Sequence, residues 1–332
     1  MMSKNNKLPL NLQELDKTTG EVVKLDINSA STVQPVALMR LGLFVPTLKS
    51  TDKSKANSKN ITDASEELVQ LSIAKSEGYT DVRITGYRLD MDTDFKVWLG
   101  IIRSMSEYGV KKDVLELSFV EFVKMCGFDS RRSNKKMRDR ISNSLFKLAS
   151  VTLKFQSETK GWTTHLVQSA FYDINEDVIE IKAEPKLFEL YHMDRKVLLR
   201  LKAIDALQRK ESAQALYTYI ESLPLNPAPI SMKRMRNRLN LTSNVYTQNY
   251  TVRKAMEQLK DIGYLDYTEF KRGHSSYFSV HYRNPKLISS TIKVSRKEDK
   301  ASEKNYDEVI NALKAAGIDP KKLAEALARM TF

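Results

Sequence analysis

The stretch YTQNYTVRKAMEQLKDIGYL, residues 246–265, predicts a helix that is apolar in only one of its halves. Its second half carries Val252, Met256, Leu259 and Ile262 at spacings of four, three and three, which is the pattern of one buried helix face. Its first half consists of Tyr, Thr, Gln, Asn and Arg, with almost nothing to bury. The exposed half of such a helix is free to contact a partner.

The composition indicates that this partner is a polyanion. The 332 residues include 54 Lys and Arg against 41 Asp and Glu, which gives a formal net charge of +13 and a pI near 9.5. A surplus of this size favours nucleic acid or an acidic membrane surface. The hydrophobic content of 41% is enough to build cores, and the length favours two domains with flanking tails.

Features of secreted and membrane proteins are missing from the sequence. The single cysteine, Cys126, excludes an internal disulfide and fits a reducing cytosol. No run approaches the roughly 20 apolar residues that cross a bilayer, and the N-terminal residues lack the apolar core of a secretory signal. We therefore expect a soluble, cytoplasmic protein.

The elements around residues 246–265 follow a recognisable order. Residues 211–223 predict a helix, Ser231 can cap a second helix over SMKRMRNRLNL, and a turn leads into the quoted helix. Gly263 is expected to end that helix, and residues 264–283 predict a hairpin with its turn at KRGHSS. The order is helix, turn, helix, hairpin.

The same order occurs about 115 residues earlier. After a predicted helix from Asp92 to Tyr108, Ser118 and Glu121 have the spacing of a capping box at the start of a second helix. A third helix is predicted over residues 130–149, and the alternating runs VTLKFQ, THLVQSAFYD and VIEIKA predict three strands. Two tandem helix-turn-helix units with β-hairpin wings are the simplest account of the repetition.

These patterns predict an α+β fold of two tandem winged helix-turn-helix domains with a flexible N-terminal segment and a short helical C-terminal tail. We place the flexible segment at residues 1–32, the N-terminal winged-helix domain at 33–185 and the C-terminal winged-helix domain at 186–285. Residues 286–332 are expected to form a linker and the short helical tail. Within the C-terminal domain, residues 186–205 are predicted to be helical.

The exposed face of the quoted helix carries side chains that are suited to base recognition. In a winged helix-turn-helix, the second helix of the pair packs one half on the core and inserts the other into the DNA major groove. At about 100° per residue, Thr247, Tyr250 and Lys254 lie nearly opposite Val252. Arg pairs with guanine, Asn with adenine, and Thr with a base edge or a thymine methyl group. Residues 231–254 contain six Lys or Arg and no Asp or Glu, which favours DNA contact over an ordinary solvated surface.

For the second domain, the predicted DNA contacts are Tyr246, Thr247, Asn249, Tyr250, Arg253, Lys254, Arg234, Arg236, Lys271 and Arg272. Lys271 and Arg272 stand with His274 at the expected tip of the wing. There they either reach a flanking phosphate or the minor groove, or are merely solvated.

The corresponding helix of the first domain is basic but has few base-reading amides. Between Arg131 and Lys147 there are seven basic residues and one acidic residue. Such a composition fits phosphate contacts better than sequence readout, and the alternative is a basic surface without a role in DNA binding. The predicted contacts are Arg131, Arg132, Lys135, Lys136, Arg138, Arg140 and Asn143. Two such domains would dock in successive major grooves about 34 Å apart.

Motifs of nucleases and of ATPases that act on DNA do not occur. The four histidines are scattered without a His-x-His pair, and no glycine-rich phosphate loop ends in Gly-Lys-Ser/Thr. Cys126 lies on the apolar face of a predicted helix and is interpreted as core. Asp90, Asp92 and Asp94 suggest either a metal site or, in the interpretation that we favour, carboxylates stabilised by the start of a helix. We expect no catalytic residue, no enzymatic activity, no metal and no cofactor.

Several long stretches, in order along the chain, carry a resemblance to a known family. They are TVQPVALMRLGLFVPTLKS, LDMDTDFKVWLGII, THLVQSAFYD, DRKVLLRLKAI, ESAQALYTYIESLP, APISMKRMRNRLN and TVRKAMEQLKDIGYLDYTE. They closely resemble the RepA-type initiators of FIB-incompatibility plasmids, which belong to the iteron-binding initiators of theta-mode plasmid replication. The resemblance covers roughly residues 31 to 285.

The resemblance implies two winged-helix domains that bind directly repeated origin sequences (iterons), open a nearby AT-rich segment and recruit the host initiator and replicative helicase. It implies that the helix starting near Tyr246 makes the principal base contacts, while the N-terminal winged helix adds DNA contacts and the dimer interface. It further implies that monomers fire the origin, whereas dimers repress the initiator's own promoter and limit copy number.

We therefore predict a sequence-specific, double-stranded DNA-binding plasmid replication initiator. Its expected partners are plasmid origin repeats, the host helicase, the host initiator and a second copy of itself in a monomer–dimer equilibrium, with no membrane. The alternative is a winged-helix transcriptional regulator that binds an operator without opening an origin.

Overall fold

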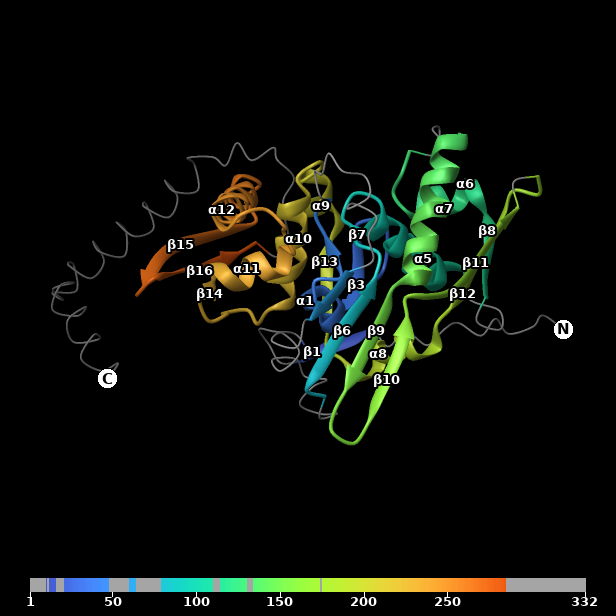
Figure 1. Ribbon diagram of the computed structural model, residues 1–332. Coiled ribbons are helices and arrows are strands. Elements are labelled where there is room, and N and C mark those ends of the chain that lie inside the picture. Colours follow the sequence, from blue (N-terminus) through green and yellow to red (C-terminus); the bar gives the residue numbers. More distant parts are fainter. Residues whose placement is uncertain are drawn as a thin grey trace, which may run out of the picture. The chain divides into compact units, whose positions relative to one another are not determined.

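The computed structural model in Figure 1 describes residues 10, 12–15, 21–47, 60–63, 79–109, 114–129, 134–173 and 175–284. The chain divides into two units, residues 1–287 and 288–332, and all the described residues belong to the first. The predicted linker and helical tail therefore lie outside the described residues. So do two predicted DNA contacts, Arg131 and Arg132.

The first occurrence of the repeated order begins with three helices and a short strand. These are α5 (Asp94–Tyr108), β8 (Val114–Ser118), α6 (Phe119–Met125) and α7 (Lys135–Ser150). Four strands follow: β9 (Thr152–Gln156), β10 (Gly161–His165), β11 (Val167–Asp173) and β12 (Val178–Ala183). In the sheet, β12 pairs with both β11 and β8, so the strand order is β11-β12-β8.

Local capping explains where two of these helices start. The Ser118 hydroxyl accepts a hydrogen bond from the Glu121 backbone N–H, as the capping-box spacing predicts. The Glu121 carboxylate, which would complete a capping box, instead accepts a hydrogen bond from the Tyr108 hydroxyl at 2.5 Å. Helix α7 starts at Lys135 and not at residue 130, since the Asn134 side chain caps it through the Met137 N–H.

The run THLVQSAFYD is not one strand, which corrects the prediction. Strand β10 ends at His165 and lies in the sheet β10-β9-β6-β5 with β6 (Asp81–Gly86) and β5 (Asn60–Asp63). Strand β11 starts at Val167 and belongs to the other sheet. Leu166 and Val167 are both buried, and two consecutive buried residues mark the point where the chain passes from one sheet to the next, because a strand in one sheet alternates its faces.

The second occurrence has the same order without counterparts of β9 and β10, and its three strands have the same pairing as β8, β11 and β12. Its elements are α10 (Glu211–Ser222), β14 (Ile230–Ser231), α11 (Met232–Leu239), α12 (Val245–Asp261), β15 (Leu265–Arg272) and β16 (Ser275–Arg283). The last strand again pairs with both others, in the order β14-β16-β15. The Ser231 hydroxyl caps α11 as predicted, and Gly263 follows α12 at φ +69°.

The region between the two occurrences contains a strand that the sequence analysis missed. Residues 186–205 do not form one helical region. They divide among α8 (Pro185–Met193), β13 (Lys196–Arg200) and α9 (Leu201–Ala206). Strand β13 forms because it pairs antiparallel with β3 (Ser31–Pro35), more than 150 residues earlier in the chain, and Figure 1 shows these two strands side by side. Local periodicity carries no information about so distant a partner.

The remaining N-terminal elements are β1 (Gln13–Leu15), β2 (Val22–Lys24), α1 (Val36–Arg40), β4 (Phe44–Val45) and β7 (Leu89–Asp90). Ser31 and Thr32, which were predicted to belong to the flexible segment, are buried in β3. Their pairing with β13 is the physical reason for this difference.

Helix α10 lies at the centre of the second occurrence. It packs against α11, α12 and β13, and also against α1 and β4 from the N-terminal part of the chain. Its Tyr217 and Tyr219 are buried, as is Trp98 of α5, so all three are core residues. Cys126 is also buried, and this burial raises the pKa of its thiol. The chain is thus a mixed α/β protein whose buried residues from both occurrences form one contiguous cluster.

Candidate nucleic-acid interface

Helix α12 is buried at one end only. Its buried residues are Val252, Ala255, Met256 and Leu259, so burial begins only at the middle of the helix. In the first half, the exposed apolar and aromatic side chains are Val245 (57% exposed), Tyr246 (85%) and Tyr250 (60%). The Asn244 side chain fixes this end by accepting the Thr247 N–H at 2.9 Å. The predicted asymmetry of the helix is confirmed.

The wing strand β15 runs alongside α12. Three polar contacts join the two elements: Lys260 Nζ to Asp266 Oδ1 at 3.0 Å, Tyr267 Oη to Glu257 Oε2 at 3.2 Å, and Arg253 Nη2 to Glu269 Oε1 at 2.8 Å. Later residues of β15 thus contact earlier residues of α12, so the two elements run in opposite directions. Alternate residues of a strand share a face, so Lys271 continues this row toward the exposed first half of α12.

The wing ends in a two-residue turn. Gly273 is the first of these two residues and has φ +60°, which glycine adopts without strain. Lys271 and Arg272 precede it and are exposed. The predicted turn at KRGHSS is therefore confirmed, and both basic residues lie at the wing tip.

Arg253 is not free in the structure, and no local sequence pattern predicts its partner. Its Nε lies 3.1 and 2.9 Å from the two Glu269 carboxylate oxygens, and its Nη2 lies 2.8 Å from Oε1. Hydrogen bonding to Arg253 lowers the pKa of Glu269. The Arg253 side chain remains 48% exposed, so the pair lies at the surface between helix and wing.

Other predicted contacts lie around α12 in different environments. Thr247, Tyr250 and Lys254 line a groove whose opposite wall includes Lys210 and Glu211 at the start of α10. Neither Arg253 nor Glu269 lines this groove. Lys254 is exposed there and suited to a phosphate contact.

Two predicted contacts carry buried polar atoms without a partner. Within the part of the chain that the structure describes, Asn249 Oδ1 and Arg236 Nε are buried and accept or donate no hydrogen bond. Arg234, in α11, lies with its guanidinium 5.5 Å from the centre of the Tyr219 ring. The ten predicted residues are thus spread over α11, α12 and the wing tip. Most of those that are exposed belong to α12.

The basic helix of the first occurrence, α7, divides into free and engaged side chains. Lys135, Lys136 and Asn143 are exposed. Arg138 instead pairs with Asp177 at 3.2 Å and lies 4.5 Å from the centre of the Phe119 ring. Arg140 Nη2 lies 2.5 Å from Asp92 Oδ2, so both arginines already have partners within the protein.

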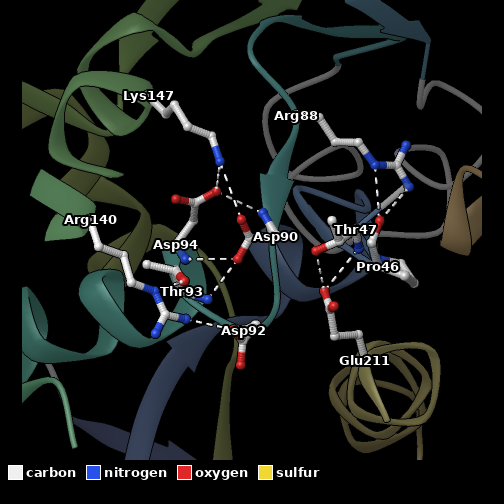
Figure 2. A network of polar contacts seen from close by, with 10 residues as sticks. All are labelled: Pro46, Thr47, Arg88, Asp90, Asp92, Thr93, Asp94, Arg140, Lys147 and Glu211. Carbon is white, nitrogen blue, oxygen red and sulfur yellow. Dashed lines mark hydrogen bonds and ion pairs between the residues drawn. The ribbon is translucent and has the colours of Figure 1, made fainter. Parts of the chain in front are cut away.

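The acidic cluster of Asp90, Asp92 and Asp94 binds Arg140 and Lys147 of α7, as Figure 2 shows. Asp90 Oδ1 accepts the backbone N–H groups of Thr93 at 2.6 Å and Asp94 at 3.2 Å, which places a carboxylate at the start of the helix. Lys147 Nζ contacts both Asp94 and Asp90. Burial and the neighbouring Asp90 raise the pKa of Asp94 to about 6. This arrangement agrees with the helix-start interpretation, and no group of three potential metal ligands occurs among the described residues.

The turn before α12 is held by a residue that precedes the first occurrence in the chain. Arg88 donates to the Asn240 carbonyl at 2.7 Å and the Leu239 carbonyl at 3.2 Å, at the end of α11. It also donates to the Pro46 carbonyl, and Thr47 donates to Glu211 (Figure 2). Backbone carbonyl acceptors leave no sequence pattern, so this connection could not be predicted.

Comparisons with known proteins identify the class. A family described as "Initiator Replication protein, WH1" matches residues 94–221. RepFIB replication protein A of Salmonella typhi is 58% identical over 277 residues, which cover 82% of this chain and 85% of the relative. Replication protein RepA of Escherichia coli is 51% identical over 267 residues, covering 80% of this chain and 92% of the relative. The class is therefore that of plasmid replication initiators.

Within that class, the chain belongs to the RepFIB replication protein A family. This confirms the resemblance carried by the seven quoted stretches. Among solved structures, domains 2 and 3 of RctB align over 75% of this chain and 98% of that chain with a TM-score of 0.46 and 11% identity, too low a likeness to define a shared fold. No helix within the described ranges is long and apolar enough to span a membrane.

Proposed function

We propose that the protein initiates plasmid replication by binding iterons in double-stranded origin DNA, opening an adjacent AT-rich segment and recruiting the host initiator and replicative helicase. The observation that carries the DNA-binding part is the exposed first half of α12, fixed by its Asn244 cap and flanked by the basic wing tip. An α-helix of this kind fits the major groove, where Arg, Asn and Thr distinguish base pairs.

We further propose that the molecule contains two tandem winged helix-turn-helix units. Support comes from the strand orders β11-β12-β8 and β14-β16-β15, in which the last strand of each unit pairs with its first. Exposed Lys135 and Lys136 on α7 would contact phosphates while α12 reads bases. A monomer that binds one repeat with both unlike units needs no two-fold symmetry in the DNA, so successive monomers suit directly repeated sites.

The regulatory part of the proposal rests on the resemblance to initiators. We infer that monomers fire the origin in the cytoplasm, and that dimers repress the protein's own gene and so limit copy number. In this proposal the protein performs no catalytic step, and strand separation is driven by the free energy of binding.

The test is footprinting of the full-length protein on its own gene and the adjoining noncoding DNA, combined with permanganate probing of unpaired thymines. We expect protection in regularly spaced direct repeats and thymine reactivity in a neighbouring AT-rich segment when the host initiator is present. Protection of a single inverted operator without any thymine reactivity would contradict the proposal and favour a transcriptional regulator.

A further inference from the structure

The contact between Arg253 and Glu269 uses only one edge of the arginine. Glu269 binds Nε and Nη2, and the described residues provide no hydrogen-bond partner for Nη1. A guanidinium is planar and carries donors along a second edge, formed by Nη1 and the other N–H of Nη2. That second edge has the paired donors that match O6 and N7 of guanine.

Glu269 is itself held in place from the wing. Its backbone pairs with Phe278 of β16, so the side chain extends from a strand that is hydrogen-bonded within the wing. It is only 27% exposed, whereas Arg253 is 48% exposed. The acid is therefore the more fixed of the two partners, and it limits the orientations of the arginine.

We propose that Glu269 is a positioning residue that orients Arg253 for a guanine in the major groove. The inference rests on the proposed function, since it assumes that the first half of α12 enters the groove. A long arginine side chain that is already held in one orientation loses less conformational entropy on binding. The wing thus contributes to base recognition through α12 without touching a base itself.

The pair has consequences for specificity as well as affinity. A carboxylate close to the groove repels phosphate, so it disfavours DNA contacts that bring no guanine to Arg253. An unpaired Arg253 would instead swing to any nearby phosphate and bind all sequences. Glu269 is therefore expected to increase the ratio of specific to non-specific affinity.

The experiment uses the full-length protein and two duplexes, one containing a single repeat protected in the footprint and one with the same bases scrambled. Dissociation constants are measured by fluorescence anisotropy at one fixed salt concentration for wild type, Glu269→Ala, Arg253→Ala and the double variant. Each guanine of the repeat is also replaced, one at a time, by 7-deazaguanine, which lacks the N7 acceptor. Asp266→Ala is the matched control, because it removes an acid and another ion pair between α12 and β15, at the far end of the helix.

We expect Glu269→Ala to weaken binding to the repeat about five- to tenfold, with equal or tighter binding to the scrambled duplex. One 7-deazaguanine position should weaken the wild type about tenfold and have little further effect on the Glu269→Ala and Arg253→Ala variants. The double variant should bind like Arg253→Ala, and Asp266→Ala like the wild type.

Two outcomes would overturn the inference. Equal loss on both duplexes, shared by Asp266→Ala, would make the pair a contact that only stabilises the wing. Tighter binding of Glu269→Ala to both duplexes would mean that Glu269 withholds Arg253 from DNA. A wild-type protein that does not distinguish the repeat from the scrambled duplex would contradict the proposed function itself, which separates the two failures.

Discussion

Asp194 is a buried carboxylate that caps a helix from a distant part of the chain. Its Oδ2 accepts the Ala37 N–H of α1 at 2.6 Å, and α1 has no side-chain cap of its own. Burial raises the pKa of Asp194 to about 6. Because the folded-state pKa lies above the unfolded value, the folded state binds the proton more tightly, and this contribution to stability is lost as the pH rises through about 6.

We predict that Asp194→Asn, which keeps the acceptor oxygen but cannot ionise, becomes more stable relative to wild type as the pH rises. The difference in the free energy of unfolding should change by about 1–2 kcal/mol between pH 5 and pH 7.5. Urea unfolding of both proteins at the two pH values measures it. Other titrating groups are common to both proteins and cancel, so a difference that does not depend on pH would contradict the assignment.

Arg253 shows how far single residues can be predicted. Its position on the exposed side of α12 follows from helical periodicity, and the structure places it at the surface beside the wing. Its pairing with Glu269, sixteen residues later, depends on the way in which the hairpin folds back along the helix. A local pattern predicts the face of a helix but not the neighbour that crosses it.

Helix α7 combines basic residues with different neighbours, and only some can be tested as DNA contacts without disturbing the fold. Lys135 and Lys136 are exposed, whereas Arg138 and Arg140 form ion pairs within the protein. Lys135→Ala combined with Lys136→Ala should weaken binding to all DNA sequences, and the slope of log K against log salt should flatten by about one unit for each phosphate that the variant no longer neutralises.

The measurement is a salt titration of DNA affinity for this double variant. Its control is Lys154→Ala combined with Lys202→Ala, which removes the same charge from exposed positions on β9 and α9. If the two double variants have the same slope, α7 makes no contact with DNA and its basic surface has another role.

Helix α10 depends on its buried face. Leu216 is fully buried, and the helix packs against α1, α11 and α12. We predict that Leu216→Ala lowers the free energy of unfolding by about 2–5 kcal/mol, because less apolar surface is buried and a cavity is left behind. Urea unfolding measures the loss, and Leu225→Ala, at a position 45% exposed, should change stability by less than about 0.5 kcal/mol. Similar losses in both variants would contradict the assigned core.

At the scale of the whole molecule, polar contacts cross the boundary that the sequence predicts near residue 186. Arg238 of α11 is buried and donates to the Met39 carbonyl at 3.1 Å and the Phe44 carbonyl at 2.9 Å. Arg88 donates to the Asn240 carbonyl at the end of α11, and β13 pairs with β3. The second occurrence therefore uses acceptors and a strand from the N-terminal part of the chain.

We predict that residues 186–285, expressed alone, do not unfold cooperatively on heating. The isolated fragment would leave the Arg238 guanidinium without two of its acceptors and β13 without its partner strand, and a buried charge that lacks partners is strongly destabilising. Thermal unfolding followed by circular dichroism tests this, with residues 21–285 as the comparison fragment. A cooperative transition in the shorter fragment would show that it is an independent domain.

The sequence by itself determined the family, through long stretches that match in order, and the elements whose cause is local. Helices α6, α11 and α12 begin at predicted or neighbouring capping residues, and α12 buries its predicted face, because capping and helical periodicity act within a few residues. Only the tertiary structure decided the division between β10 and β11, the β3–β13 pair and the partners of Arg88, Arg238 and Arg253. These features depend on strands and hydrogen-bond acceptors that are distant in the chain, and they exist only once packing has brought those segments together.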